Sequence, residues 1–265
     1  MNKSMQRIYA LIGKPLGHSL SADYFNDLFE SQGIDARYIL QELDDLSALR
    51  PWLESNPAIV GLNVTSPYKV EVCNYLDEID TEAKYVGAVN TIVVDRTGGR
   101  MRLLGYNTDV QGVVESLQPL LTPERQHALV LGTGGAAQAV AQALKRLGRD
   151  CTLVSRDPQA PHILSYDALT PELIADKWII INATPVGMGS LIMERPQIPY
   201  EGITPEHVCM DLIYNPEETR FLKACREQGA TTINGLKMLL VQARYAWHIL
   251  SLIHISEPTR PISIS

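Results

Sequence analysis

A glycine-rich turn, Gly132-Thr133-Gly134-Gly135-Ala136, follows a short apolar run and precedes an alanine-rich stretch. A strand that leads through such a turn into a helix brings free backbone N–H groups and the positive end of the helix together. Gly132 permits the tight turn, and Gly134 lets a phosphate approach the backbone. A tight turn that binds nothing is the weaker reading, because the surrounding strand and helix patterns agree with the motif. The turn predicts a dinucleotide-binding enzyme.

Ser155-Arg156 lies at the end of the next expected strand. Folds that bind NAD usually have an acidic residue there for the ribose, whereas an arginine accommodates the 2′-phosphate of NADP. A planar guanidinium suits a phosphate, so the sequence predicts NADP. Arg156 could instead be a solvated loop residue, and the neighbouring Asp157 leaves the use of NAD open.

Polar clusters also occur where expected strands end. They are His18–Ser21, Asn63–Lys69, Gly87–Thr91 and Asn107–Asp109. Each has an ordinary structural explanation: Ser19 or Ser21 could cap the following helix, and Asp109 could cap another. Asn63 and Asn90 could simply end their strands. Ligands of an α/β sheet bind at the carboxyl ends of strands, so the clusters are also candidates for one site.

Alternating strands and helices would position these residues. In the first part of the chain, strands are expected at 8–13, 36–40 and 59–64, helices at 24–29, 46–53 and 70–76, and a hairpin of 90–94 with 102–104. After a helix at 110–117, strands are expected at 127–131, 150–154, 178–182 and 208–212, with helices between them and a final helix at 235–250. Such alternation predicts two α/β domains with parallel or mostly parallel sheets.

The composition is that of an ordinary globular protein, with 45% hydrophobic and 20% charged residues. A net charge of -7 argues against nucleic acid or an anionic membrane as the main partner. The four cysteines form no CxxC pair, so we expect neither a metal site nor a disulfide framework. No apolar leader or membrane segment is evident, which favours a cytoplasmic protein. Residues 251–265 show no sustained period, and we expect a disordered or foreign tail there.

The clusters, the glycine turn, Asn182–Pro185, Asp211–Tyr214 and Asn234–Gln242 together resemble the shikimate dehydrogenase family in their order and spacing. The resemblance extends from about residue 8 to 250. It implies a substrate-binding and catalytic domain at 1–109, completed by the helix at 235–250. It also implies a Rossmann-like NADP-binding domain at 110–234, with a cleft between the two domains. Ala22 and Arg220 depart from the family pattern.

The resemblance also implies roles for individual residues. Lys69 and Asp109 would form the catalytic pair, with Lys69 as the cationic donor to the ketone oxygen. The remaining substrate contacts would come from Ser19 and Ser21, which would hold the carboxylate, and from Asn63, Thr65, Asn90, Asp109, Gln242 and Tyr214. The remaining cofactor contacts would come from Thr184, Gly235 and Met238.

The implied reaction is the reversible, NADPH-dependent reduction of 3-dehydroshikimate to shikimate, in the biosynthesis of chorismate and aromatic amino acids. Three alternatives stay open: a quinate/shikimate dehydrogenase that uses NAD, a non-catalytic regulator that binds the same ligands, and an enzyme for another small cyclic acid. Retention of both Lys69 and Asp109 speaks against the regulator. We expect a monomer or homodimer.

Overall fold

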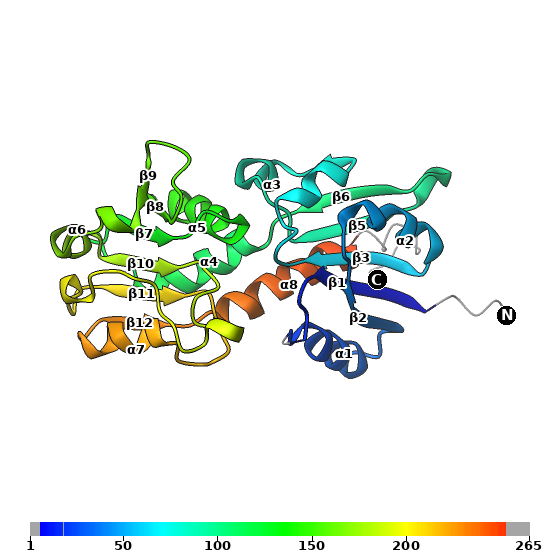
Figure 1. Cartoon of the computed structure of the whole chain (residues 1–265). Coiled ribbons are helices and arrows are strands. Elements are labelled where there is room, and N and C mark those ends of the chain that lie inside the picture. Colours follow the sequence, from blue (N-terminus) through cyan, green and yellow to red (C-terminus); the bar gives the residue numbers. More distant parts are fainter. Residues whose placement is uncertain (1–5, 18, 253–265) are drawn as a thin grey trace, which may run out of the picture. The chain divides into compact units, whose positions relative to one another are not determined.

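The computed structural model describes residues 6–17 and 19–252, and it separates into two compact units (Figure 1). Unit 1 contains the described residues up to Lys84, the segment Val89–Thr108 and the residues from Ala243 onward. Unit 2 contains Tyr85–Ala88 and Asp109–Gln242. Each unit is built around its own six-stranded sheet.

Unit 1 has a mixed sheet in the order β2-β1-β3-β5-β6-β4. Its strands are β1 (Arg7–Gly13), β2 (Ala36–Glu42), β3 (Ile59–Val64), β4 (Glu78–Ile79), β5 (Thr91–Asp95) and β6 (Arg102–Tyr106). Strand β5 runs antiparallel to both of its neighbours, and the other pairs are parallel. The sheet is therefore mostly parallel, with the predicted hairpin between β5 and β6.

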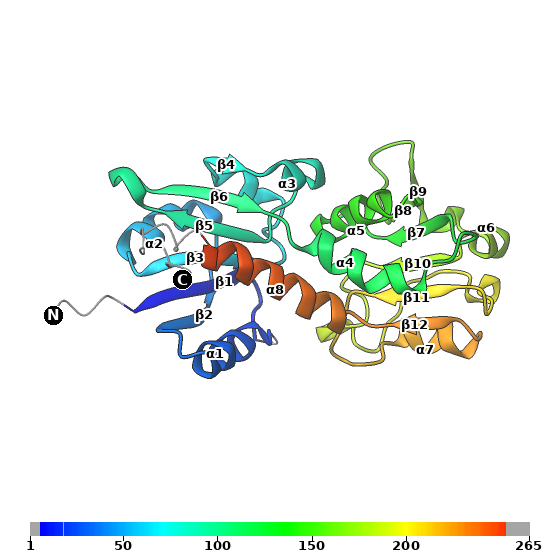
Figure 2. The same cartoon turned by 180° about the vertical axis from the view of Figure 1, so that it is seen from behind.

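Alternation along β1 places apolar side chains on both faces of this sheet. Tyr9 and Leu11 pack against α1 (Ser21–Ser31) and against Ala243 and Leu250 of α8 (Leu236–Leu252). Figure 2 shows α1 and this part of α8 beside the sheet. On the other face, Ala10 and Ile12 pack with residues of the 3₁₀-helix η1 (Leu46–Ala48), α2 (Leu49–Ser55), the 3₁₀-helix η2 (Glu71–Tyr75) and α3 (Thr81–Val86).

Unit 2 has an all-parallel sheet in the order β9-β8-β7-β10-β11-β12. Its strands are β7 (His127–Leu131), β8 (Asp150–Ser155), β9 (Ile163–Ser165), β10 (Ile179–Asn182), β11 (Val208–Asp211) and β12 (Thr231–Ile233). Numbered within the unit, this is the order 3-2-1-4-5-6 of a Rossmann fold. The predicted fold class, two α/β sheets of which the second is Rossmann-like, is confirmed.

Helices cover both faces of the second sheet. On one face lie α4 (Asp109–Leu117) and α5 (Gly135–Arg146), whose Val113 and Ala137 share a core with Val130 of β7. On the other face, α6 (Pro171–Asp176) and α7 (Arg220–Glu227) share a core with alternate strand residues such as Leu129. Further 3₁₀-helices are η3 (Thr97–Gly99), η4 (Gln118–Leu120), η5 (Tyr166–Ala168), η6 (Gly189–Leu191) and η7 (Tyr200–Gly202).

Several predicted boundaries were wrong. The stretch 46–53 divides into η1 and α2, because Pro51 has no N–H for a helical bond to the carbonyl of Ser47. Residues 251 and 252 extend α8, so the expected tail begins too early. The Ser251 hydroxyl donates to the His248 carbonyl at 3.2 Å, one turn back along the helix. The rest of the expected tail, from residue 253, lies outside the described residues.

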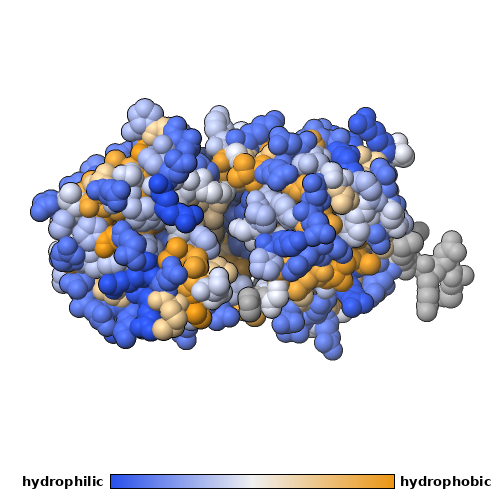
Figure 3. All heavy atoms as spheres, viewed as in Figure 1, coloured by the Kyte–Doolittle hydropathy of each residue, from blue (hydrophilic) through white to orange (hydrophobic). Residues whose placement is uncertain are grey.

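The surface seen in Figure 3 is mostly polar and is interrupted by small apolar patches. The exposed large apolar side chains of unit 2 include Met188, Ile192 and Met193, in the segment that follows β10. In the part of the chain that the structure describes, no helix has the length and apolar character needed to span a membrane.

Candidate functional site

Candidate substrate residues of unit 1 lie at one edge of its sheet, the edge formed by the carboxyl ends of β1 and β3. Strands β1 and β3 are parallel neighbours, and β5 is antiparallel to β3. The carboxyl ends of β1 and β3 therefore meet the beginning of β5, and β6 also ends there. This edge carries the predicted residues Asn63, Thr65, Lys69 and Asn90, and Ser19 and Ser21 lie farther along the chain from the end of β1.

Asn63 lies within β3 and is buried, with 7% of its surface exposed. Its Oδ1 accepts a hydrogen bond of 2.8 Å from the hydroxyl of Tyr38 in β2. Its Nδ2 donates to the Asn90 carbonyl at 3.3 Å and to the Thr91 hydroxyl at 3.2 Å. Tyr38, which the sequence analysis missed, thus fixes the orientation of the Asn63 amide. Burial also raises the pKa of Tyr38, which keeps its hydroxyl a donor.

Asn90 immediately precedes β5, and its side chain holds the segment that follows β6. Its Nδ2 donates to the Thr108 hydroxyl, and its Oδ1 accepts from the Thr108 backbone N–H, each at 2.9 Å. Both residues are almost completely buried. Asn63, Asn90 and Thr108 therefore form a connected polar group, which goes beyond the strand-ending role that each asparagine could have had alone.

Thr65 and Lys69 lie in the segment that follows β3, and both are half-buried. The Lys69 carbonyl accepts from the Val89 backbone N–H at 2.7 Å, which holds this segment against the residues before β5. A Cβ on Gly13 would lie 2.3 Å from Cγ2 of Thr65, so only glycine at the end of β1 allows this approach. The structure thus brings Lys69 and Asn90 to neighbouring segments.

Ser19 and Ser21 lie where the loop after β1 enters α1. The Ser19 hydroxyl oxygen accepts a 3.2 Å hydrogen bond from the Ser21 backbone N–H, and both residues are half-buried. The helix is capped at Leu20 without a side-chain hydrogen bond, so neither serine acts as the conventional cap considered above. His18 of the same cluster lies outside the described residues.

The glycine turn of unit 2 joins β7 to α5. Gly132 has a φ of 115°, a conformation that favours glycine. Gly134 is the N-cap of α5, and no side-chain hydrogen bond caps the helix there. A Cβ added to Gly134 would have no described atom within 4 Å. The turn therefore presents an open helix N-terminus, and its residues fit a pyrophosphate.

Strands β7 and β10 are the neighbours at which the strand order reverses. In such sheets, ligands bind at the carboxyl ends of strands at this point. A Cβ on Gly132 would lie 3.1 Å from the Ala183 carbonyl oxygen and 3.3 Å from Cγ2 of Thr184. The fold thus brings Thr184, predicted as a cofactor residue, beside the glycine turn.

Ser155 ends β8, the strand next to β7. Its hydroxyl accepts from the Asp157 backbone N–H at 3.2 Å and donates to the Asp157 carbonyl at 3.1 Å, which closes a tight turn around Arg156. The Arg156 side chain is exposed. No ion pair involving it occurs among the residues that the structure describes, so its guanidinium is available to an anion.

Asp109 is the first residue of α4 and is buried, with 3% of its surface exposed. One turn later, Gly112 faces the beginning of α8. A Cβ on Gly112 would lie 2.8 Å from the Met238 carbonyl oxygen and 3.4 Å from Cβ of Gln242. Met238 is itself mostly buried in the core, whereas Gln242 is half-buried.

Tyr214 and Gly235 lie on two connected segments at the end of the second sheet. The Gly235 N–H donates to the Ile213 carbonyl at 3.0 Å. A Cβ on Gly235 would lie 2.0 Å from the Leu212 carbonyl oxygen, so only glycine fits there. Tyr214, next to Ile213, is half-buried. Of the predicted site residues, Ser19, Ser21, Asn63, Thr65, Lys69 and Asn90 belong to unit 1, and the others belong to unit 2.

Comparisons with known proteins find relatives over nearly the whole chain. Residues 11–92 match the family described as the shikimate dehydrogenase substrate binding domain. A shikimate dehydrogenase (NADP(+)) of Carboxydothermus hydrogenoformans is 38% identical over 91% of this chain and 90% of that protein.

Solved structures agree with these relatives. A chorismate mutase/shikimate 5-dehydrogenase fusion protein from Clostridium acetobutylicum is 38% identical, with a TM-score of 0.80 over 94% of this chain and 91% of that one. Shikimate 5-dehydrogenase from Thermus thermophilus, in complex with NADP(H) and shikimate, is 34% identical, with a TM-score of 0.80 over 92% and 93% of the two chains.

Proposed function

The chain belongs to the shikimate dehydrogenase family, and from this premise we propose that it catalyses the reversible, NADPH-dependent reduction of 3-dehydroshikimate to shikimate. This reaction would place it in chorismate and aromatic amino acid biosynthesis. The observation that carries the proposal is the similarity to a shikimate dehydrogenase (NADP(+)) over 91% of the chain, in a structure that has both a glycine turn at a helix N-terminus and polar residues, including a lysine, near the carboxyl ends of strands in unit 1.

We assign the two ligands to the two units. The glycine turn with Ser155 and Arg156 would hold NADP, and Thr184, Gly235 and Met238 would contact it near the nicotinamide. The edge of unit 1, with Ser19, Ser21, Asn63, Thr65 and Asn90, would hold the substrate together with Tyr214 and Gln242. A domain division at 1–109 and 110–234, with the helix at 235–250 completing the first domain, remains a prediction, as does a monomeric or homodimeric cytoplasmic protein.

The proposed chemistry needs a hydride, which NADPH supplies when it is bound. As a ketone is reduced, negative charge develops on its oxygen, and a cationic donor beside that oxygen lowers the barrier. The Lys69 ammonium group would stabilise this charge and deliver the proton to the oxygen. The Asp109 carboxylate would orient the lysine and the substrate hydroxyl. In the reverse direction, the same lysine would take the proton from the hydroxyl of shikimate.

Replacement of Lys69 tests whether the protein is an enzyme or a regulator that only binds its ligands. We expect Lys69→Ala to lower kcat by ~10²–10⁴, because general acid catalysis of this kind contributes that much. The Kd of NADPH, measured by its fluorescence, should stay within about twofold of the wild type, because Lys69 is assigned to the substrate and not to the cofactor.

Lys84→Ala is the matched control, because Lys84 is an exposed lysine in α3 of the same unit. It should leave both kcat and the Kd unchanged. An unchanged kcat in the Lys69→Ala variant would remove the lysine from the mechanism. A wild-type protein that binds NADPH but neither reduces 3-dehydroshikimate nor oxidises shikimate would favour the regulator.

A further inference from the structure

Asp211 ends β11 and is completely buried, yet nothing in the proposed chemistry uses it. Its carboxylate accepts three hydrogen bonds: from the Thr219 hydroxyl at 2.6 Å, the Ile213 N–H at 3.0 Å and the Asn182 side-chain amide at 3.1 Å. Burial raises the pKa of this carboxyl to about 6, although the three donors oppose the rise. At neutral pH the group is therefore ionised, and it can only accept hydrogen bonds.

An acceptor at this position helps to fix the orientation of the Asn182 amide. Asn182 ends β10, next to β11, and is also completely buried. Its Nδ2 donates both to Asp211 and to the Val186 carbonyl, each at 3.1 Å, so its Oδ1 faces the other way, toward Thr184. That oxygen accepts from the Thr184 N–H at 3.1 Å and from the Thr184 hydroxyl at 2.6 Å.

The orientation of Asn182 in turn sets that of Thr184. The Thr184 hydroxyl donates inward to Asn182 and accepts from the Val186 N–H at 3.2 Å. Its methyl group then lies toward the glycine turn, where a Cβ on Gly132 would be 3.3 Å away. A continuous series of hydrogen bonds thus runs from Asp211 through Asn182 to Thr184, the residue packed against Gly132.

We propose that Asp211 is a positioning residue for the dinucleotide site, acting through the Asn182 amide to hold Thr184 against the glycine turn. This inference rests on the proposed function, because it takes the turn to be the place where NADP binds. A buried carboxylate is costly to keep ionised, and an apolar core would be cheaper if the site needed only stability. With Asp211 and the Val186 carbonyl as acceptors of its Nδ2, and the Thr184 N–H as a donor to its Oδ1, the Asn182 amide is held in one orientation.

The test is Asp211→Asn, which preserves the shape of the side chain but offers one acceptor oxygen where three donors converge. The Asn182 Nδ2 then keeps the Val186 carbonyl but loses the carboxylate as its second acceptor, so the amide is held less firmly against Thr184. We expect the Kd of NADPH to rise by about tenfold, a typical effect of losing a hydrogen bond to a charged group. We also expect amide exchange to accelerate at Thr184 and Val186, even without the cofactor, because the acceptors of both N–H groups, Asn182 Oδ1 and Thr184 Oγ1, are held less firmly.

Asp77→Asn is the matched control, since Asp77 is a carboxylate of unit 1 that also accepts from a backbone N–H and another side chain. It should leave the Kd of NADPH and the two exchange rates unchanged. A purely structural role for Asp211 would lower the melting temperature and the active fraction, but the Kd of the folded protein would stay as it is. A folded Asp211→Asn protein with wild-type Kd and exchange rates would overturn the inference.

Thr184→Val provides a second variant in case the buried substitution prevents folding. It removes the hydroxyl that joins Asn182 to Thr184 and preserves the volume of the side chain. The Kd of NADPH should rise, and an unchanged value would again overturn the inference. Failure of the wild type itself to bind NADPH would contradict the proposed function instead, and it would leave the exchange experiment to decide the role of Asp211 in the hydrogen-bond series.

Discussion

Arg156 is the residue on which the preference for NADP over NAD rests. Its exposed guanidinium follows β8, at the tight turn closed by Ser155. We expect Arg156→Gln to lower kcat/KM for NADP+ by ~10–100-fold, since a hydrogen bond to a charged group contributes ~1.5–3 kcal/mol. The value for NAD+, which lacks the 2′-phosphate, should change by less than about twofold. Steady-state kinetics with each dinucleotide measure both effects.

Arg220→Gln is a suitable control for this variant. Arg220 is an exposed arginine of the same unit, and its guanidinium lies 3.9 Å from the Met193 sulfur. Its replacement should affect neither dinucleotide. An equal decrease in kcat/KM for NADP+ and NAD+ in Arg156→Gln would mean that Arg156 does not bind the 2′-phosphate.

Residues that belong to local motifs could be predicted, whereas those that act across strands could not. The glycine turn can be recognised in the sequence because its residues are contiguous and its glycines are explained by steric requirements. Tyr38 and Asp211 are different, because their importance depends on contacts with Asn63 and Asn182 in neighbouring strands. The alternating pattern of β2 indicates that Tyr38 points inward, but no sequence signal shows what its hydroxyl reaches.

At the scale of elements, long periodic segments were predicted well and very short ones were missed. Strands β4, β9 and β12 have only two or three residues each, too few to show a period. They form because the sheet edge beside them offers unpaired backbone groups. The edge strand β4 is further held by side chains that come from distant parts of unit 1.

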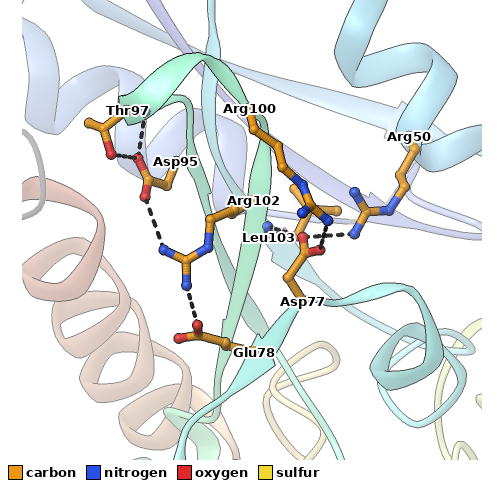
Figure 4. Close-up of polar contacts among 8 residues, drawn as sticks. All are labelled: Arg50, Asp77, Glu78, Asp95, Thr97, Arg100, Arg102 and Leu103. Carbon is orange, nitrogen blue, oxygen red and sulfur yellow. Dashed lines mark hydrogen bonds and ion pairs between the residues drawn. The ribbon is translucent and has the colours of Figure 1, made fainter.

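Figure 4 shows this network at the edge of the first sheet. The Asp77 carboxylate accepts from Arg50 of α2 and from the Leu103 backbone N–H of β6, each at 2.8 Å, and Arg100 lies 3.8 Å away. Beside it, Arg102 of β6 contacts Glu78 and Asp95. These contacts join α2, β4 and β6 where the backbone pairing is shortest.

Asp77 should make the stability of unit 1 sensitive to acid. The hydrogen bond from Arg50, followed by that from the Leu103 N–H, lowers the pKa of this carboxyl below its ordinary value of 3.8. Its contribution to stability is therefore complete above that ordinary value and is lost as the pH falls through the lower pKa of the folded state. We expect Asp77→Asn to reduce the free energy of unfolding at neutral pH by about 1 kcal/mol.

Urea denaturation at several pH values measures this effect. The difference between the wild type and Asp77→Asn should be constant from neutral pH down to about 4, and it should shrink at lower pH, where the wild-type carboxylate becomes protonated. A difference that grows as the pH falls would have the wrong sign and would contradict the assignment.

At the scale of the whole molecule, the alternation of strands and helices predicts two sheet-based units, and the structure contains both. Assignment of the family needed more, because the fold alone supports many reactions. It depended on several motifs in one order and on relatives that are similar to this chain over about nine-tenths of its length. We expect the preference for shikimate and NADP to depend on individual side chains such as Arg156, which substitution can test.

The most direct test of the central claim is to follow NADPH or NADH formation by absorbance when the protein oxidises shikimate or quinate with NADP+ or NAD+. We predict that shikimate with NADP+ gives the highest kcat/KM of the four combinations, because Arg156 and the polar edge of unit 1 suit these two ligands. Equal or better turnover of quinate with NAD+, or no turnover of shikimate with NADP+, would contradict the account.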